Sequence, residues 1–134
     1  MASSLSPKEL VEALFEAIEK KDFSTVRDVC DPDIDWVLNE GFPGGGHLKG
    51  VEEVISKGLP GAGRDWESFY FQPKETIGAG DCVVVLGWYR GRHRATGNKV
   101  EAAAAQIFDI SNRRIARFRQ FADTHMIHKA MYPS

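Results

Sequence analysis

Four side chains of this sequence could move protons in a reaction that needs no metal. His47 follows three consecutive glycines, and Glu40 lies just before the same glycine- and proline-rich stretch, so both could reach a binding site from a loop. Asp123 and His93 are two further candidates. Because an imidazole titrates near neutral pH, His47 at the mouth of a pocket could act as a general base. The alternative is a solvated surface histidine.

Patterns for metals, phosphates and activated nucleophiles are weak. His125 and His128 are three residues apart near Asp123, but no third ligand is placed with them. Gly44–Gly46 lacks the lysine and the preceding strand of a phosphate-binding loop. There is also no CxxC pair and no Ser/His/Asp set that the expected elements would bring together. We therefore expect no metal and no cofactor.

The composition is that of one soluble globular domain of 134 residues. The chain is 43% hydrophobic, and 17 basic and 19 acidic residues give a net charge of −2. This excludes a strongly cationic protein whose charge alone would attract nucleic acid. No apolar run is long enough to span a membrane, and the first residues lack the pattern of a secretory signal. Cys30 and Cys82 are too few for a disulfide scaffold, so we expect a reduced, cytoplasmic protein.

Helices are expected mainly in the first part of the chain. Ser6 and Glu9 have the spacing of a capping box, and apolar residues then recur at helical spacing as far as Lys21. Asp22 is expected to cap a short second helix, and residues 51–56 a third. The glycine- and proline-rich stretch after residue 40 is expected to be a loop.

Strand patterns dominate the rest of the chain. After a short strand at residues 34–38, four long strands are expected at residues 67–77, 82–94, 100–110 and 115–122. Helices followed by a meander of antiparallel strands predict an α+β fold, with a four-stranded sheet curling over the helices around a space. Residues 125–134 are expected to be a C-terminal tail.

Alternation along the strands predicts which side chains face that space. Arg90, Arg92 and Arg94 share one face of their strand, and unpaired guanidiniums cannot be buried, so Tyr89 and His93 must face inward. The same reasoning on the other strands gives an inner wall composed of Trp36, Leu38, Tyr89, His93, Gln106, Phe118 and Gln120.

Gln106 and Gln120 are the most informative members of this wall. A buried amide must find partners in another side chain, in water or in a ligand. Ala102 and Ala104 leave room beside them. The two glutamines therefore predict either a ligand site or a purely structural polar network.

The opposite face of the sheet is also apolar. It presents Trp88, Ala103, Ala105, Ile107 and Phe121. We expect two sheets to pack face to face in a homodimer, with arginines at the rim pairing with Glu101 and Asp109. The alternative is a set of isolated surface apolar residues. The alternating arginines could also form a phosphate-binding stripe, but the acidic net charge argues against nucleic acid as a partner.

The order of these segments resembles the SnoaL-like branch of the nuclear-transport-factor-2-like superfamily over nearly the whole chain. The residues that carry this resemblance are Asp33–Trp36, Gly50–Val54, Thr96–Gly97, Ala105–Ile110 and Arg114–Thr124. The resemblance implies a single cone-shaped domain over residues 1–134, with N-terminal helices packed in a strongly curved antiparallel or mixed sheet that encloses a pocket. It also implies a dimer formed through the sheet.

The enzymes of this superfamily use catalytic groups that this chain lacks. Ketosteroid isomerase uses a tyrosine and two aspartates, and the resemblance places Leu14, Leu38 and Gln106 at those positions. The Asp-Arg-Asp relay of the epoxide hydrolases falls near Tyr89, Gly87 and Gln120. The acid or base that projects from the last strand of the cyclase-like enzymes is also replaced, by Gln120.

These observations leave two functions open. The first is a pocket protein of the polyketide cyclase-like kind that binds a small hydrophobic, oxygen-bearing metabolite and performs acid–base isomerase, cyclase or hydrolase chemistry. His47, Glu40 or Asp123 would then transfer protons, while Tyr89 and Gln106 orient an oxygen. The second is a non-catalytic ligand-binding or accessory dimeric module, favoured by the loss of the proton-transfer groups.

Overall fold

Two capped helices open the chain. The computed structural model describes residues 5–59 and 63–133. Helix α1 (Pro7–Lys20) begins with the predicted capping box, in which the Ser6 hydroxyl accepts from the Glu9 amide and the Glu9 carboxylate accepts from the Ser6 amide. Helix α2 (Phe23–Val29) is capped by Asp22, as predicted. The apolar face of α1 is buried against the sheet, as its spacing predicts.

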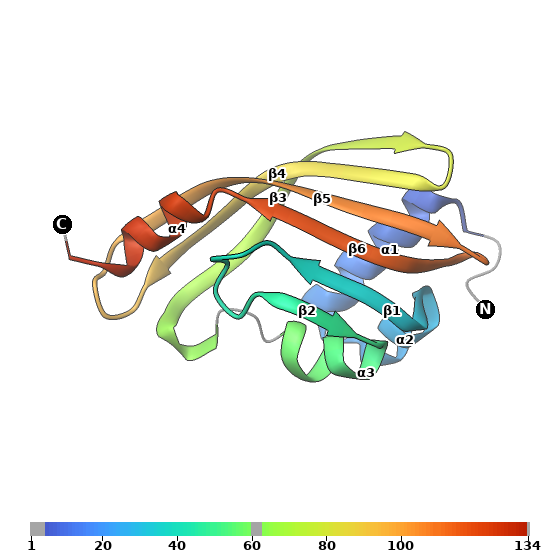
Figure 1. Ribbon diagram of the computed structural model, residues 1–134, viewed down its shortest axis with the longest axis horizontal. Helices are drawn as coiled ribbons and strands as arrows, with labels where there is room; N and C mark the ends of the chain where they lie inside the picture. The colour runs from blue at the N-terminus through green and yellow to red at the C-terminus, as the bar shows by residue number, and fades with distance from the viewer. Residues whose placement is uncertain (1–4, 60–62, 134) are drawn as a thin grey trace.

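The sheet has six strands rather than the four expected. Its order is β2-β1-β6-β5-β4-β3, and only β1 and β6 run parallel. The strands are β1 (Cys30–Leu38), β2 (Gly46–Lys49), β3 (Trp66–Ala79), β4 (Cys82–His93), β5 (Lys99–Ser111) and β6 (Arg114–Ala122). The sheet curls around α1 without closing (Figure 1), which confirms the α+β class.

Strand β2 forms where a loop alone was expected. Its four residues pair with β1, with Val37 opposite His47 and Leu38 opposite Gly46. Gly46 has a φ of +133°, a conformation that glycine adopts without strain. The prediction failed because a short edge strand among glycines carries almost no alternation of its own and depends on its neighbour for pairing.

Two glycines allow the sheet to coil. Strand β3 shifts register against β4 near Pro73 and again near Ser68. A Cβ atom on Gly87 would lie 2.2 Å from the carbonyl oxygen of Gln72, and one on Gly91 would lie 2.2 Å from that of Ser68. Side chains at these two positions would push β3 away and flatten the sheet over the helices.

Short helices complete the fold. Residues 51–58 form α3 (Val51–Glu53) followed by a π-helical turn, in place of the single helix expected. A 3₁₀ turn covers Gly63–Asp65. The segment expected to be a tail contains helix α4 (Thr124–Met131), whose Ile127 is fully buried. Among the described residues, no helix is long and apolar enough to cross a membrane.

Candidate functional site

The seven side chains predicted to form an inner wall are all buried. They are Trp36, Leu38, Tyr89, His93, Gln106, Phe118 and Gln120. Rings pack closely among them, and Trp36 stacks on Phe118 with 3.9 Å between ring centroids. The alternation of the strands therefore predicts correctly which face of each strand turns inward.

Tyr89, Gln106 and Gln120 form a hydrogen-bonded group, called here the polar cluster. The β5–β6 register places Gln106 directly opposite Gln120. Gln106 Nε2 donates to the Tyr89 hydroxyl at 3.0 Å, and that hydroxyl donates to Gln120 Oε1. Tyr89 lies further along β4, opposite Ala102, and the small side chains of Ala102 and Ala104 leave space for the phenol to reach the glutamines.

The polar cluster leaves two of its own atoms without partners. Gln106 is 5% exposed and Gln120 is 1% exposed, and neither Gln106 Oε1 nor Gln120 Nε2 makes a hydrogen bond. A buried acceptor and a buried donor without partners each carry a desolvation cost of ~1–3 kcal/mol. The cluster thus offers one acceptor and one donor to a molecule that enters the interior.

The polar cluster is electrically neutral. Burial raises the pKa of Tyr89 well above its ordinary value, and the hydrogen bond from Gln106 offsets only part of this rise. The phenol therefore keeps its proton across the physiological range. Such a group can donate or accept hydrogen bonds, but it cannot act as a base near neutral pH.

Phe42 covers this cluster, and it is not among the residues that the strand pattern predicts for the inner wall. It lies in the loop between β1 and β2 and is only 7% exposed. Its ring centroid lies 5.0 Å from that of Tyr89 and 5.8 Å from that of Phe69. Phe69 also stacks on Tyr89 at 5.1 Å. A large apolar residue inside a glycine- and proline-rich loop was the signal that could have identified it.

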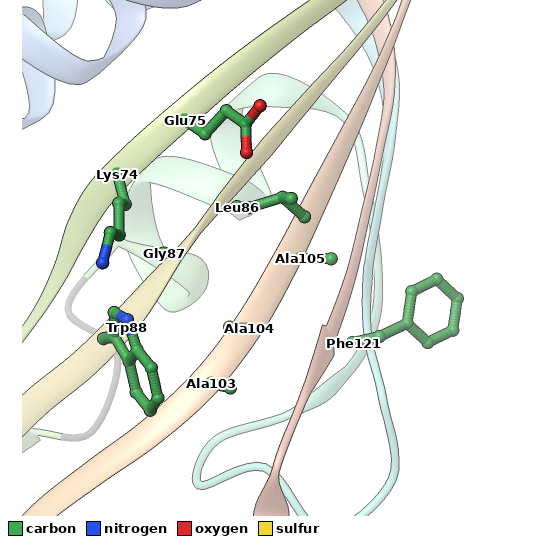
Figure 2. A pocket seen from close by; sticks show the side chains of 9 residues that line it. All are labelled: Lys74, Glu75, Leu86, Gly87, Trp88, Ala103, Ala104, Ala105 and Phe121. Atoms are coloured by element: carbon green, nitrogen blue, oxygen red, sulfur yellow. The ribbon is translucent and has the colours of Figure 1, made fainter.

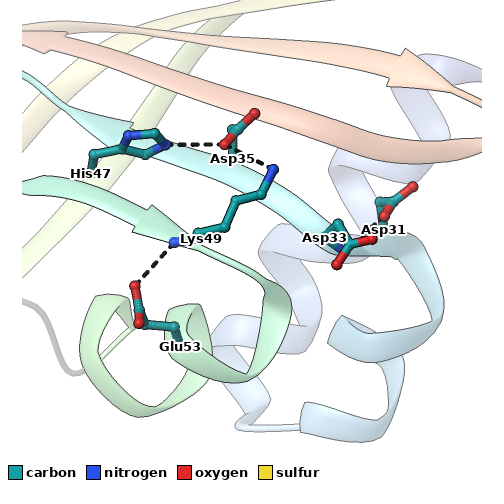
Figure 3. Close-up of polar contacts among 6 residues, drawn as sticks. All are labelled: Asp31, Asp33, Asp35, His47, Lys49 and Glu53. Atoms are coloured by element: carbon teal, nitrogen blue, oxygen red, sulfur yellow. Dashed lines mark hydrogen bonds and ion pairs between the residues drawn. The ribbon is translucent and has the colours of Figure 1, made fainter.

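His47 lies on the exposed edge strand β2 and lines neither of the two hollows described below. Its side chain is 60% exposed, and its Nε2 is 3.0 Å from Asp35 Oδ1 on the outer face of β1, as Figure 3 shows. Lys49 Nζ is 3.2 Å from the same oxygen. The hydrogen bonds from His47 and then Lys49 lower the pKa of Asp35. His47 thus belongs to a solvated ion-pair group.

The other candidate bases separate into exposed and buried groups. Glu40 is exposed in the loop after β1, and Asp123 is exposed at the start of α4, where its carboxylate accepts from the Met126 amide at 3.3 Å. His93 alone is buried, with its ring edge-on to that of Trp66 at 4.9 Å. The structure therefore does not bring His47, Glu40 and Asp123 together at the polar cluster.

One of the two histidines near the C-terminus, His128, forms a hydrogen bond within the protein itself. His128 Nε2 donates to the carbonyl oxygen of Gly41 at 2.6 Å. Within residues 5–59 and 63–133, no group of three metal-ligating side chains is close enough to hold an ion.

Three arginines of the outer face pair with acids of the same chain, whereas Arg92 and Arg94 donate to backbone carbonyls. Arg90 pairs with Glu101, and Arg117 and Arg119 lie 2.7 and 3.2 Å from Asp109. These acids neutralise much of the arginine stripe, which weakens it as a phosphate-binding surface.

Two hollows are found outside the space between sheet and helices. One, of about 530 Å³, lies on the outer face of the sheet (Figure 2). Its lining includes Leu86, Trp88, Ala103, Ala105 and Phe121. A second, of about 260 Å³, lies beside the start of α1 and the β5–β6 turn. Neither is the inner pocket that the sequence predicts, and aromatic rings pack against the inner wall instead.

The SnoaL-like domain family matches residues 11–118, and the chain belongs to this family. No curated protein matches it. A nuclear-transport-factor-2-like protein from Burkholderia thailandensis E264 is 28% identical, with a TM-score of 0.87 over 96% of this chain and 99% of that one. TerC, crystallised with polyporic acid, is 22% identical, with a TM-score of 0.80 over 94% and 98% of the two chains. A protein of Jannaschia sp. CCS1, provisionally named a SnoaL-like polyketide cyclase, is 16% identical, with a TM-score of 0.78 over 93% and 90%.

Proposed function

We propose that this protein binds a small, uncharged, largely apolar molecule that carries a hydroxyl and a carbonyl oxygen. The observation that supports this most directly is the pair of unpartnered buried atoms in the polar cluster. A ligand hydroxyl would donate to Gln106 Oε1, and a ligand carbonyl would accept from Gln120 Nε2. The ligand would thereby satisfy two polar groups that are otherwise left without partners.

The surroundings of the polar cluster favour a neutral aromatic ligand. The rings of Phe42 and Phe69 lie against Tyr89, and no lysine, arginine or carboxylate is among the buried side chains of the described residues. A charged ligand would lose its hydration there without gaining a counter-ion. TerC, a solved structure of the same fold, was crystallised with a small organic molecule, polyporic acid, which supports a small-molecule ligand for this chain as well.

Binding without chemistry is the function that these positions support best. Three of the four candidate bases are exposed, and His47 is paired with Asp35 on the outer face. Catalysis remains a second candidate because His93 is buried on the same strand as Tyr89. His93 would then be the base, and it would act on a part of the ligand about 13 Å along β4 from Tyr89, because four residues of strand separate the two.

Benzoin and its methyl ether provide a matched test of this proposal. Benzoin is neutral and aromatic and has adjacent hydroxyl and carbonyl groups, whereas its methyl ether has lost the hydroxyl donor. We expect benzoin to bind and Gln106→Leu or Gln120→Leu to weaken binding roughly tenfold or more, in line with the loss of one buried hydrogen bond. The methyl ether should bind the unmodified protein as weakly as benzoin binds Gln106→Leu.

Gln72→Leu is the control for these substitutions. Gln72 is exposed and accepts a hydrogen bond from Arg90, so its replacement should leave benzoin affinity unchanged. If the Gln106→Leu and Gln120→Leu variants bound benzoin as tightly as the unmodified protein does, the proposal would be contradicted. A failure of the unmodified protein to bind benzoin, measured by titration calorimetry, would contradict it as well.

We also propose that a second copy of this chain covers the outer face of the sheet. Phe121 is 54% exposed and stands at the edge of the hollow, whose floor is formed by alanines. Lys74 and Glu75 lie at the same hollow, so two copies related by a two-fold axis can place opposite charges across from each other. An exposed apolar face of this kind is typical of an interface between subunits.

A further inference from the structure

We infer that Phe42 is a gate over the ligand site, and that the loop of residues 39–45, called here the gate loop, must move outward before a ligand can reach the polar cluster. This inference rests on the proposed function and describes how that same site is reached. It concerns a residue outside the strands that form the inner wall.

The position of Phe42 is the first argument. Its ring is buried against Tyr89 and Phe69, yet its backbone belongs to the irregular connection between β1 and β2. A side chain on a loop can leave the interior without breaking the pairing of any strand. Since Phe42 is in contact with the ring of Tyr89, its departure would open apolar space directly beside the polar cluster.

The gate loop is built from residues that tolerate a change of backbone conformation. Gly41 and Gly44 have φ values of +87° and +71°, and Gly45 lies between Gly44 and β2. Within the loop, the Phe42 amide donates to the Asn39 carbonyl at 3.2 Å and the Gly45 amide donates to the Phe42 carbonyl at 2.7 Å. These are local turns, which can form or break independently of the sheet.

The two ends of the gate loop are attached differently. The Asn39 side chain donates to the Ala122 carbonyl at 3.1 Å and accepts from the Ala122 amide at 3.2 Å, so it extends the β1–β6 ladder and fixes the start of the loop. Further along, the loop is held by the packing of Phe42 and by the hydrogen bond from His128 to the Gly41 carbonyl. Helix α4, which lies at the same end of the sheet (Figure 1), therefore holds the middle of the gate loop through this hydrogen bond.

A disulfide between the gate loop and α4 would test this arrangement. A Cβ atom on Gly41 would lie 3.3 Å from the Cβ atom of Thr124, close to the separation that disulfides require. The double variant Gly41→Cys/Thr124→Cys, made together with Cys82→Ser, can be locked by oxidation and released by reduction. The single variant Gly41→Cys controls for the strain of a side chain at a positive φ.

The association rate of benzoin, followed by stopped-flow fluorescence, is the quantity to compare. We expect it to be at least tenfold lower in the oxidised double variant than in the reduced one, while reductant has no effect on the single variant. Equal rates in the oxidised and reduced forms would overturn the gate but leave the proposed function intact. If no form bound benzoin, the proposed function would fail, and the gate with it.

Phe42→Leu provides an independent test that preserves an apolar side chain. The smaller residue should raise the association rate severalfold, because it covers less of Tyr89 and leaves the interior more easily. A variant that is merely less stable would show a lower midpoint of unfolding with the same association rate, and that result would contradict a gating role. Phe121→Leu, which changes an exposed phenylalanine on the outer face, is the matched control.

Discussion

Gln106 Nε2 donates a hydrogen bond to the Tyr89 hydroxyl across 3.0 Å, although the two residues belong to different strands and are not opposite each other in the ladder. The contact exists because Ala102 and Ala104 occupy the intervening inner positions of β5. Larger side chains there would force the phenol away from the glutamines. The polar cluster thus depends on small residues as much as on polar ones.

Replacing Tyr89 with phenylalanine should lower the free energy of unfolding by ~1–3 kcal/mol. The ring would still fill its place, but Gln120 Oε1 would lose the Tyr89 hydroxyl as a donor and keep only the bond from Gln106 Nε2 at 3.4 Å. Urea denaturation measures the change. Tyr132→Phe is the control, because Tyr132 is 63% exposed, and it should leave the stability unaltered. Equal stabilities of the two variants would show that the hydroxyl contributes nothing.

The phenol of Tyr89 should also make the free energy of unfolding decrease as the pH rises into the alkaline range. Burial raises the pKa of Tyr89 in the folded protein above its ordinary value of 10.0. Above about pH 10 the unfolded chain therefore loses this proton while the folded protein retains it, so the free energy of unfolding falls as the pH rises. Tyr89→Phe should show a shallower decline between pH 10 and pH 11.

The thiol of Cys30 also makes the free energy of unfolding fall at alkaline pH. Comparing the unmodified protein with Tyr89→Phe removes this contribution. Burial raises the pKa of Cys30 to about 12 from 9.0, so its effect begins near pH 9. Cys30 is present in both proteins, and the difference between the two pH profiles therefore belongs to Tyr89. Identical slopes in the two profiles would contradict the direction of the Tyr89 shift.

The orientation of the inner wall could be predicted from sequence because the arginines provide a strong constraint. Arg90, Arg92 and Arg94 must face outward, and alternation then fixes Tyr89 and His93. Which inward residues touch could not be predicted, because contact depends on the register of two strand pairs. The meeting of Tyr89 with Gln120, a residue of another strand, is of this kind.

Loop residues were placed less well, for a different physical reason. His47 was expected near a pocket mouth, but pairing of β2 with β1 turns it toward Asp35 on the outer face. Phe42 was overlooked, because loop side chains follow no period that reveals their direction. Helix α4 lies where a tail is expected, and Asp123, which caps it, is the residue of the sequence that indicates a helix there.

Two substitutions of Asp123 should separate a capping role from a catalytic one. Asparagine caps helices as well as aspartate, so Asp123→Asn should retain stability, whereas Asp123→Ala should lower the free energy of unfolding by ~1 kcal/mol. Benzoin affinity should be unchanged in Asp123→Asn. Thermal and urea denaturation measure the first effect and calorimetry the second. If Asp123→Asn bound benzoin much more weakly while its stability was unchanged, Asp123 would take part in ligand binding as well as in capping.

Phe121→Glu should convert a dimer into monomers. In the proposed dimer, a carboxylate at this position would be buried against apolar residues of the second copy, and the dissociation constant should rise roughly a hundredfold or more. Sedimentation equilibrium should give the mass of two 14.9 kDa chains for the unmodified protein and of one chain for the variant at the same concentration.

Tyr132→Glu tests whether any added charge on an exposed aromatic position would do the same. Tyr132 follows α4 and does not line the hollow on the outer face, so this variant should sediment as a dimer. A single-chain mass for the unmodified protein would refute the interface. Of the two substituted residues, only Phe121 lies beside Ala105 on the outer face of the sheet. If both glutamate variants dissociated equally, the added charge rather than the apolar surface around Phe121 would therefore control assembly.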